Sequence, residues 1–207
     1  MITVTAVRVG AKYSLEHVEK LFRAVRRNLT IEHDYLLLTD RLDDVPTVEG
    51  TLAVMPTAEP KWWGKLELFR RDWPGTNELL FIDLDNVVCG SLNEMATYPG
   101  EIVGIRDVVL KGQMNSGCMK IRPRSAPEVW EHYAADRAAA KFRYRWGDQH
   151  LISEVAAGKI IYWPDEWVPF YKYSTVEQRD KARVVSYNGH PKPWHLPDDP
   201  TVGRHWI

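Results

Sequence analysis

An apolar run that ends in two aspartates constrains the fold more than any other part of the sequence. Residues 79–91 read LLFIDLDNVVCGS, and the positions from Leu79 to Ile82 are all apolar. A run without polar alternation is typical of a strand that is covered on both faces, as in the centre of an α/β sheet. Ligands of open α/β sheets bind beyond the carboxyl ends of such strands, and Asp83 and Asp85 follow there. We therefore expect a buried strand that leads directly into a functional site.

The rest of the chain alternates between strand-like and helix-like patterns. Ser14 is a candidate N-cap for a helix whose apolar residues recur at helical spacing from Leu15 to Leu29. The other expected helices are 63–71, 126–140 and 148–157, and the expected strands are 2–9, 35–38, 52–55, 79–84, 102–105, 118–121, 159–163 and 182–187. This alternation predicts an α/β fold in a single domain over residues 1–207, without repeats.

Composition and charge limit the class of partner. The chain has 207 residues, 44% of them hydrophobic, which is enough to bury a substantial core. A formal net charge of -1 gives no electrostatic reason to expect a nucleic acid. No apolar stretch approaches the roughly 20 residues of a transmembrane helix, and residues 1–9 do not resemble a signal peptide. With only Cys89 and Cys118 present, we expect a reducing compartment, the cytoplasm.

The D-x-D pair itself indicates a metal site. Two neighbouring carboxylates raise each other's pKa, and their repulsion is removed when a divalent cation that prefers oxygen ligands, such as Mg²⁺ or Mn²⁺, binds between them. The alternative is that one aspartate caps the turn and the other is solvated. Two enzyme classes place such a pair after a buried strand: nucleotide-sugar glycosyltransferases, and aspartate-nucleophile phosphohydrolases with the motif D-x-D-x-[TV]-[LV]. The sequence DLDNVV fits both.

The phosphohydrolase hypothesis is the weaker of the two. Asp83 would attack phosphorus, Asp85 would act as acid and base, and a further carboxylate pair would complete a Mg²⁺ site. The segment GDQHLISE supplies Asp148 but no well-placed second acid. That class also usually carries its D-x-D near the start of the chain, whereas several elements precede it here.

Five motifs together resemble one family. In chain order they are KWWGKLELFR, LLFIDLDNVVCGSLNEM, MNSGCMKIRP, GDQHLISE and GHPKPWHL. Over nearly its whole length the sequence resembles the family 8 glycosyltransferases, the glycogenin and galactosyltransferase-like group, including shorter bacterial and phage sequences of this type. The resemblance implies a GT-A fold, a Rossmann-like nucleotide-diphospho-sugar transferase domain whose mixed central sheet is flanked by helices. It also implies sugar transfer with retention from a nucleotide-sugar, in the first instance a UDP-sugar, to a saccharide or other hydroxyl acceptor.

The resemblance further implies a set of site residues. Asp83 and Asp85 match the metal-binding D-x-D, with Mn²⁺ (or Mg²⁺) as cofactor. Lys192 matches the lysine that meets the diphosphate, and Asp148 and Gln149 match the pair near the reacting carbon, so that these three are the catalytic candidates. The substrate-binding candidates are Val7, Arg8, Tyr13, Lys65, Asp107, Asn115, Ser116 and Gly189. Because no carboxylate stands out as a nucleophile, we expect a front-face mechanism in which the departing phosphate deprotonates the acceptor.

Two points stay open at the level of sequence. The family's third metal ligand is a histidine at the position of Ser186, so that His190 or Asn188, and less readily His195, would have to replace it. If none does, the metal is held by two aspartates, phosphates and water. This departure and the short chain also leave a catalytically silent nucleotide-sugar binding module as a third hypothesis.

The second open point concerns Tyr13, which either stacks on the nucleotide base or packs beneath the following helix.

Aromatic residues of a late segment are candidates for contact with an acceptor. They follow the expected strand 159–163 and comprise Trp163, Trp167, Tyr171 and Tyr173. Aromatic faces in such a loop stack on a sugar or pack against their own loop.

Overall fold

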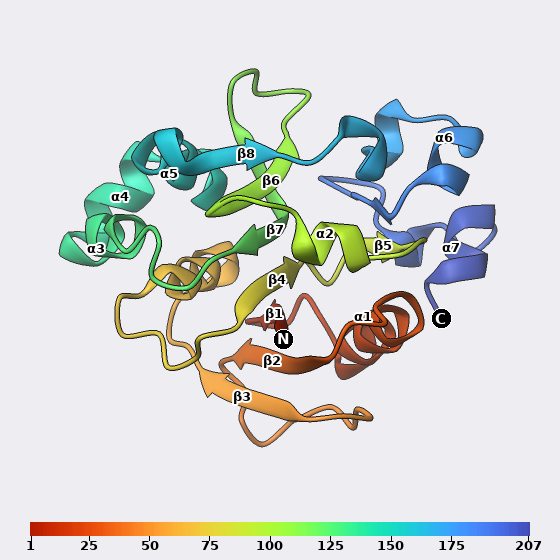
Figure 1. Cartoon of the computed structure of the whole chain (residues 1–207), viewed down its shortest axis with the longest axis horizontal. Coiled ribbons are helices and arrows are strands. Elements are labelled where there is room, and N and C mark those ends of the chain that lie inside the picture. The colour runs from red at the N-terminus through yellow and green to blue at the C-terminus, as the bar shows by residue number, and fades with distance from the viewer.

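The computed structural model describes residues 1–207, and its centre is a seven-stranded mixed sheet (Figure 1). The strands are β1 (Ile2–Arg8), β2 (His33–Thr39), β3 (Leu52–Pro56), β4 (Glu78–Ile82), β6 (Ile102–Arg106), β7 (Met114–Ile121) and β8 (Ile160–Tyr162). Their order is β3-β2-β1-β4-β7-β6-β8, from the bottom to the top of Figure 1. β1 to β4 are parallel, and β7 is antiparallel to both neighbours. β4, predicted to be a central strand, occupies the middle position.

The strand registers bring the D-x-D pair to one edge of the sheet. Phe81 of β4 pairs with Thr5 of β1, and Ile82 pairs with Cys118 of β7. Asp83 follows one residue later, and its backbone N–H donates to the carbonyl of Gly117 at 2.8 Å. The carboxyl ends of the parallel strands therefore meet beside the aspartates, as expected for a ligand site of an open α/β sheet.

A second, short ladder holds the C-terminal part of the chain against the same edge. It pairs β5 (Val87–Val88), just after the D-x-D, with β9 (Val184–Val185) in antiparallel fashion. All four valines are buried. Because residues 186–195 follow β9 directly, this ladder brings most of the motif GHPKPWHL to the aspartates.

Helices cover both faces of the sheet (Figure 1). They are α1 (Leu15–Asn28), α2 (Asn93–Thr97), α3 (Glu128–Ala135), α4 (Arg137–Arg143), α5 (Asp148–Val155), α6 (Val176–Lys181) and α7 (Pro200–His205). In this view α3, α4 and α5 lie on the left, and α1, α6 and α7 lie on the right. None of these helices combines the length and the apolar composition that crossing a membrane requires.

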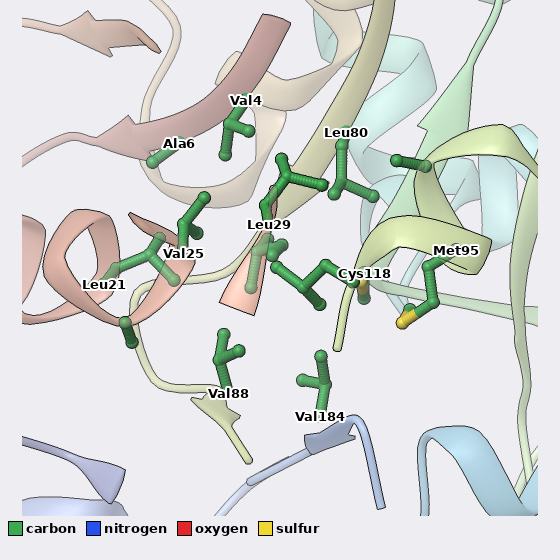
Figure 2. Packing of buried hydrophobic residues seen from close by; sticks show 14 of the residues in the cluster. Val4, Ala6, Leu21, Val25, Leu29, Leu80, Val88, Met95, Cys118 and Val184 are labelled. Atoms are coloured by element: carbon green, nitrogen blue, oxygen red, sulfur yellow. The ribbon is translucent and has the colours of Figure 1, made fainter. Parts of the chain in front are cut away.

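Each face of the sheet has its own hydrophobic core. Figure 2 shows part of the cluster on the α1 side, where Leu21 and Val25 of the helix lie near Val4 of β1. Ser14 begins this helix in a capping box with His17, as its position predicts. The central sheet and its flanking helices confirm the expected mixed α/β fold.

Two expected helices differ from those observed. The segment 63–71 forms a 3₁₀ helix, η1 (Lys61–Phe69), which is buried without interruption from Trp63 to Phe69; its packing between sheet and helices overrides the helical pattern. The expected helix 126–140 is broken at Asp136, whose carboxylate accepts the N–H of Ala139 at 2.9 Å and caps α4. An aspartate competes for backbone donors in this way, which favours a cap over a helix interior.

Candidate active site

A cavity of about 910 Å³ opens at the edge of the sheet that carries the D-x-D pair. It is lined from β1, η1, β7, α5 and the segment 186–195. All but two of the residues predicted for the site line it: Val7, Tyr13, Lys65, Asp83, Asp85, Asn115, Ser116, Asp148, Gln149, Gly189, His190 and Lys192. The exceptions are Arg8 and Asp107.

Asp85 is neutralised by ammonium groups from two distant parts of the chain. Its Oδ2 lies 2.7 Å from Lys192 Nζ and 3.0 Å from Lys12 Nζ, and it accepts the hydroxyl of Tyr13 at 2.7 Å. Burial by itself would raise the pKa of Asp85, but the charges of Lys192 and Lys12 outweigh it and hold that pKa below its ordinary value. The carboxylate is therefore charged, and two cations line the cavity beside it.

Asp83 shares a buried lysine with Asp148. Lys65 Nζ lies 2.9 Å from Asp83 Oδ2 and 3.6 Å from Asp148 Oδ2. Burial raises the pKa of Asp83 to about 6, with Asp85 adding to the rise and Lys65 opposing it. For Lys65, burial would lower the pKa, but Asp148 and Asp83 outweigh it and raise the pKa above its ordinary value. Lys65 therefore stays charged, and its ammonium group pairs with both carboxylates.

The backbone around the pair is tied to β7 at a glycine. Asn86 Nδ2 donates to the carbonyl of Gly117 at 2.7 Å, beside the bond from the Asp83 N–H to the same carbonyl. A Cβ at position 117 would lie 2.9 Å from Asn115 Oδ1. A side chain at position 117 would therefore displace the amide of Asn115, which lines the cavity.

A polar network from β7 and α5 lines another part of the cavity. Ser116 Oγ donates to Asp148 Oδ2 at 2.6 Å, and Asn115 Nδ2 donates to Gln149 Oε1 at 3.3 Å. Asp107 Oδ2 accepts from Asn115 Nδ2 at 3.3 Å and from Gln149 Nε2 at 3.2 Å. Asp107 does not line the cavity; its carboxylate orients the two amides, and the expected contact with substrate stays a prediction.

Arg8 is also removed from the cavity. Its side chain is 1% exposed, its guanidinium donates to the carbonyls of Tyr13 and Asp44 at 3.3 and 2.8 Å, and it pairs with the Asp44 carboxylate. With its donors engaged in this way, Arg8 fixes the loop that carries Tyr13, and the expected direct contact with substrate stays a prediction. Its ion-pair partner is 36 residues away in sequence, so that the pairing is not readable from the local motif.

Tyr13 packs near α1 and also lines the cavity. Its ring lies 5.8 Å from His17 of α1 and edge-on to Trp194 at 6.1 Å, and the side chain lines the cavity. Burial, together with Asp85 and Asp83, raises the pKa of the hydroxyl well above its ordinary value. Tyr13 is therefore a neutral hydrogen-bond donor to Asp85, a role that the sequence did not indicate.

The side chains of the cavity supply part of a binding site for a divalent cation. Asp83 and Asp85 offer the carboxylate oxygens that Mg²⁺ and Mn²⁺ prefer, and both face the cavity. No group of three His, Cys, Asp or Glu side chains lies close enough together to hold an ion. His190 and Asn188 both line the cavity, and the ring of His190 stacks on that of His195 at 5.5 Å. The two aspartates would hold the cation, and His190 or Asn188, or phosphate and water oxygens alone, would supply the remaining ligands.

We expect cation binding to weaken below pH 6. A proton and the cation compete for Asp83, whose pKa is about 6. As the pH falls through 6 the carboxylate becomes protonated, and the affinity for Mn²⁺ falls by up to about tenfold per pH unit. Titration of Mn²⁺ by calorimetry between pH 5 and 7.5 measures this. An affinity that does not change over that range would show that Asp83 does not bind the cation.

Several residues that line the cavity were not predicted from the sequence, among them Lys12, Trp62 and Trp146. Lys12 precedes Tyr13, Trp62 lies within the motif KWWGKLELFR, and Trp146 precedes the motif GDQHLISE, all of which were singled out. That adjacency is the signal that would have found them.

The expected aromatic segment lies elsewhere. Trp163 is buried in the core, and none of Trp163, Trp167, Tyr171 and Tyr173 lines the cavity. Tyr173 instead lines a separate cavity of about 490 Å³. The packing of these side chains thus removes the expected acceptor contact from this segment.

Solved glycosyltransferase structures share this fold. No protein-family model matches the sequence, and no curated protein matches it. The structure is similar to the glycosyltransferase GlyE of Streptococcus pneumoniae TIGR4, with a TM-score of 0.72 and 14% identity over 94% of this chain and 57% of that chain. The galactosyltransferase LgtC, in complex with donor and acceptor sugar analogs, gives 0.70 and 13% over 97% of this chain and 91% of LgtC. The bifunctional glycosyltransferase WbbM gives 0.63 and 13% over 93% and 46%.

These similarities establish the fold. The chain spans 57% of the length of GlyE and 91% of that of LgtC. The fold that the motif resemblance implied is thereby confirmed: the chain has the GT-A fold found in these glycosyltransferase structures.

Proposed function

We propose that the protein is a glycosyltransferase that moves a sugar from a nucleotide-sugar, in the first instance a UDP-sugar, to a hydroxyl acceptor with the help of Mn²⁺ or Mg²⁺. One observation carries the proposal. Two carboxylates at the tip of the central strand face a large cavity together with three ammonium groups, which lie 2.7 to 3.0 Å from them. This arrangement suits a diphosphate, whose charge needs several cations and whose metal needs carboxylate ligands.

The lysines would stabilise the leaving group. As the sugar-phosphate bond breaks, negative charge grows on the nucleoside diphosphate, and ammonium groups fixed beforehand lower the barrier. Lys192 is the best placed, because it lines the cavity and its ammonium is held 2.7 Å from Asp85. When bound, the divalent cation supplies further positive charge to the same oxygens.

The acceptor side would work without a covalent intermediate. Asp148 is engaged by Ser116 at 2.6 Å and by Lys65 at 3.6 Å, so that it is a poor candidate for a nucleophile. Gln149 lines the cavity beside it and would bind sugar hydroxyls. These contacts support retention by a front-face route, in which the departing phosphate takes the proton of the acceptor hydroxyl.

Two broader expectations belong to the same proposal. The sheet, both cores and the cavity draw on elements from the whole of residues 1–207, which supports one GT-A domain. Both cysteines are free, with Cys118 buried, which supports a reducing compartment such as the cytoplasm.

A thermal-shift screen tests the proposal. Nucleotide-sugars that differ in base and sugar are added with and without Mn²⁺, and we expect one donor to raise the Tm by several degrees only when Mn²⁺ is present. The protein with that donor is then assayed for release of free sugar and for transfer to added glycosides. Phosphate release from sugar phosphates would instead favour the phosphohydrolase, and donor binding without turnover would favour the silent binding module. If no nucleotide-sugar raises the Tm, the proposal is wrong.

A further inference from the structure

Two tryptophans at the cavity are exposed far more than their size favours. Trp62 is 45% exposed and Trp146 is 63% exposed, and both line the cavity. Neither belongs to a hydrophobic core cluster. Large aromatic surfaces left to solvent at a cavity are typical of a binding site.

The backbone holds the two tryptophans on one side of the cavity. Trp62 lies in the first turn of η1, where the next residue, Trp63, is buried and stacks on Tyr133 at 5.2 Å. Gly147, which follows Trp146, has a φ of +85°, and a Cβ there would lie 2.6 Å from Nε1 of Trp62. Because only glycine allows this approach, the indole of Trp62 lies against the loop that presents Trp146.

The same loop leads into the residues expected near the reacting carbon. Gly147 is the N-cap of α5, and Asp148 and Gln149 are its first two residues. The diphosphate side of the cavity, with Lys12 and Lys192 on Asp85, is formed by other segments. A group bound on the tryptophans would thus lie beside Gln149, which is the place of an acceptor and not of the nucleotide.

Saccharides have the chemistry that such a surface recognises. One face of a pyranose ring is formed by C–H groups and packs on an aromatic plane, while its hydroxyls need polar partners at the edge. Gln149, Asn115 and Lys61 line the same cavity and supply such partners.

We propose that Trp62 and Trp146 form the acceptor subsite and that the acceptor is a saccharide. This inference rests on the proposed glycosyl transfer. It replaces the acceptor contact expected at residues 163–173 and names side chains that act on the acceptor alone.

Fluorine NMR tests the inference without relying on turnover. The protein is labelled with 5-fluorotryptophan, and Trp62→Phe and Trp146→Phe assign the two resonances. With UDP and Mn²⁺ present, the protein is titrated with the methyl glycosides of glucose and galactose, with lactose and with maltose. We expect at least one of these saccharides to shift both resonances and to leave that of the core residue Trp63 in place. If none shifts either resonance, the inference is overturned.

Kinetics provide the matched control. Trp62→Ala and Trp146→Ala should raise the acceptor KM about tenfold, as expected for the loss of one aromatic contact, and leave the donor-induced Tm shift unchanged. Phe142→Ala should alter neither, because Phe142 is 76% exposed nearby in α4 but does not line the cavity. An unchanged acceptor KM in both tryptophan variants would overturn the inference while leaving the proposed transfer intact. If no nucleotide-sugar raised the Tm of the unmodified protein, the proposed function itself would instead be refuted.

Discussion

Replacing Asp85 by asparagine will abolish metal-dependent donor binding and lower kcat/KM by about a hundredfold or more. The substitution keeps the shape of the side chain and removes the charge that a cation needs. It also removes the counter-ion of Lys192 and Lys12. Calorimetric titration with Mn²⁺ and the donor found by the screen measures the loss.

The same change will cost stability, which the sequence alone did not suggest. The motif alone suggests that Asp85 serves only to bind a metal, and that its replacement leaves the stability of the fold unchanged. In the structure Asp85 neutralises the buried Lys192 at 2.7 Å, so that Asp85→Asn leaves an unpaired ammonium and lowers the free energy of unfolding by about 3 kcal/mol. Urea denaturation measures this loss.

A double variant separates the two effects. Asp85→Asn combined with Lys192→Met removes both charges, and we expect it to recover most of the lost stability while donor binding stays absent. If Asp85→Asn alone bound donor and Mn²⁺ as tightly as the unmodified protein, our interpretation of the D-x-D motif would be wrong.

Replacing Lys65 by methionine will have the second-largest effect. Lys65 is the one cation between Asp83 and Asp148, at 2.9 and 3.6 Å, and methionine keeps its bulk. The loss leaves the buried Asp148 and the half-buried Asp83 without this partner, which lowers the free energy of unfolding by about 3 kcal/mol at pH 7.5. Because Asp83, whose pKa is already about 6, is then more readily protonated, the deficit shrinks as the pH falls towards 5. Urea denaturation at the two pH values measures the difference.

The control for this variant keeps the charge. Lys65→Arg should retain a cation between the same two carboxylates and lose much less stability at pH 7.5 than Lys65→Met. A Lys65→Met protein as stable as the unmodified one at pH 7.5 would mean that the buried ion pairs do not contribute as we infer.

The sequence identified features that are local in the chain. An apolar run from Leu79 to Ile82 predicted the central strand, and Asp83 and Asp85 were found because they follow it directly. The periodicity of the segment after Ser14 likewise predicted α1. Residues such as Gln149 came from the resemblance to a family, since no pattern of spacing assigns them a role.

Contacts between distant segments were not predictable in the same way. Lys12 reaches Asp85 across 73 positions, and Arg8 is withdrawn from the cavity by Asp44, 36 positions away. Local composition does not encode such pairings, because they depend on how the strands are ordered. The exposure of Trp62 has the same origin, since only the fold distinguishes it from the buried Trp63 beside it.

The most direct test of the account is diffraction from crystals grown with Mn²⁺ and the donor selected by the screen, measured at the manganese absorption edge. We expect an anomalous peak beside the carboxylates of Asp83 and Asp85, and a diphosphate between that peak and Lys192. A donor bound with no anomalous signal near the two aspartates, or with its diphosphate away from Lys192, would contradict the account.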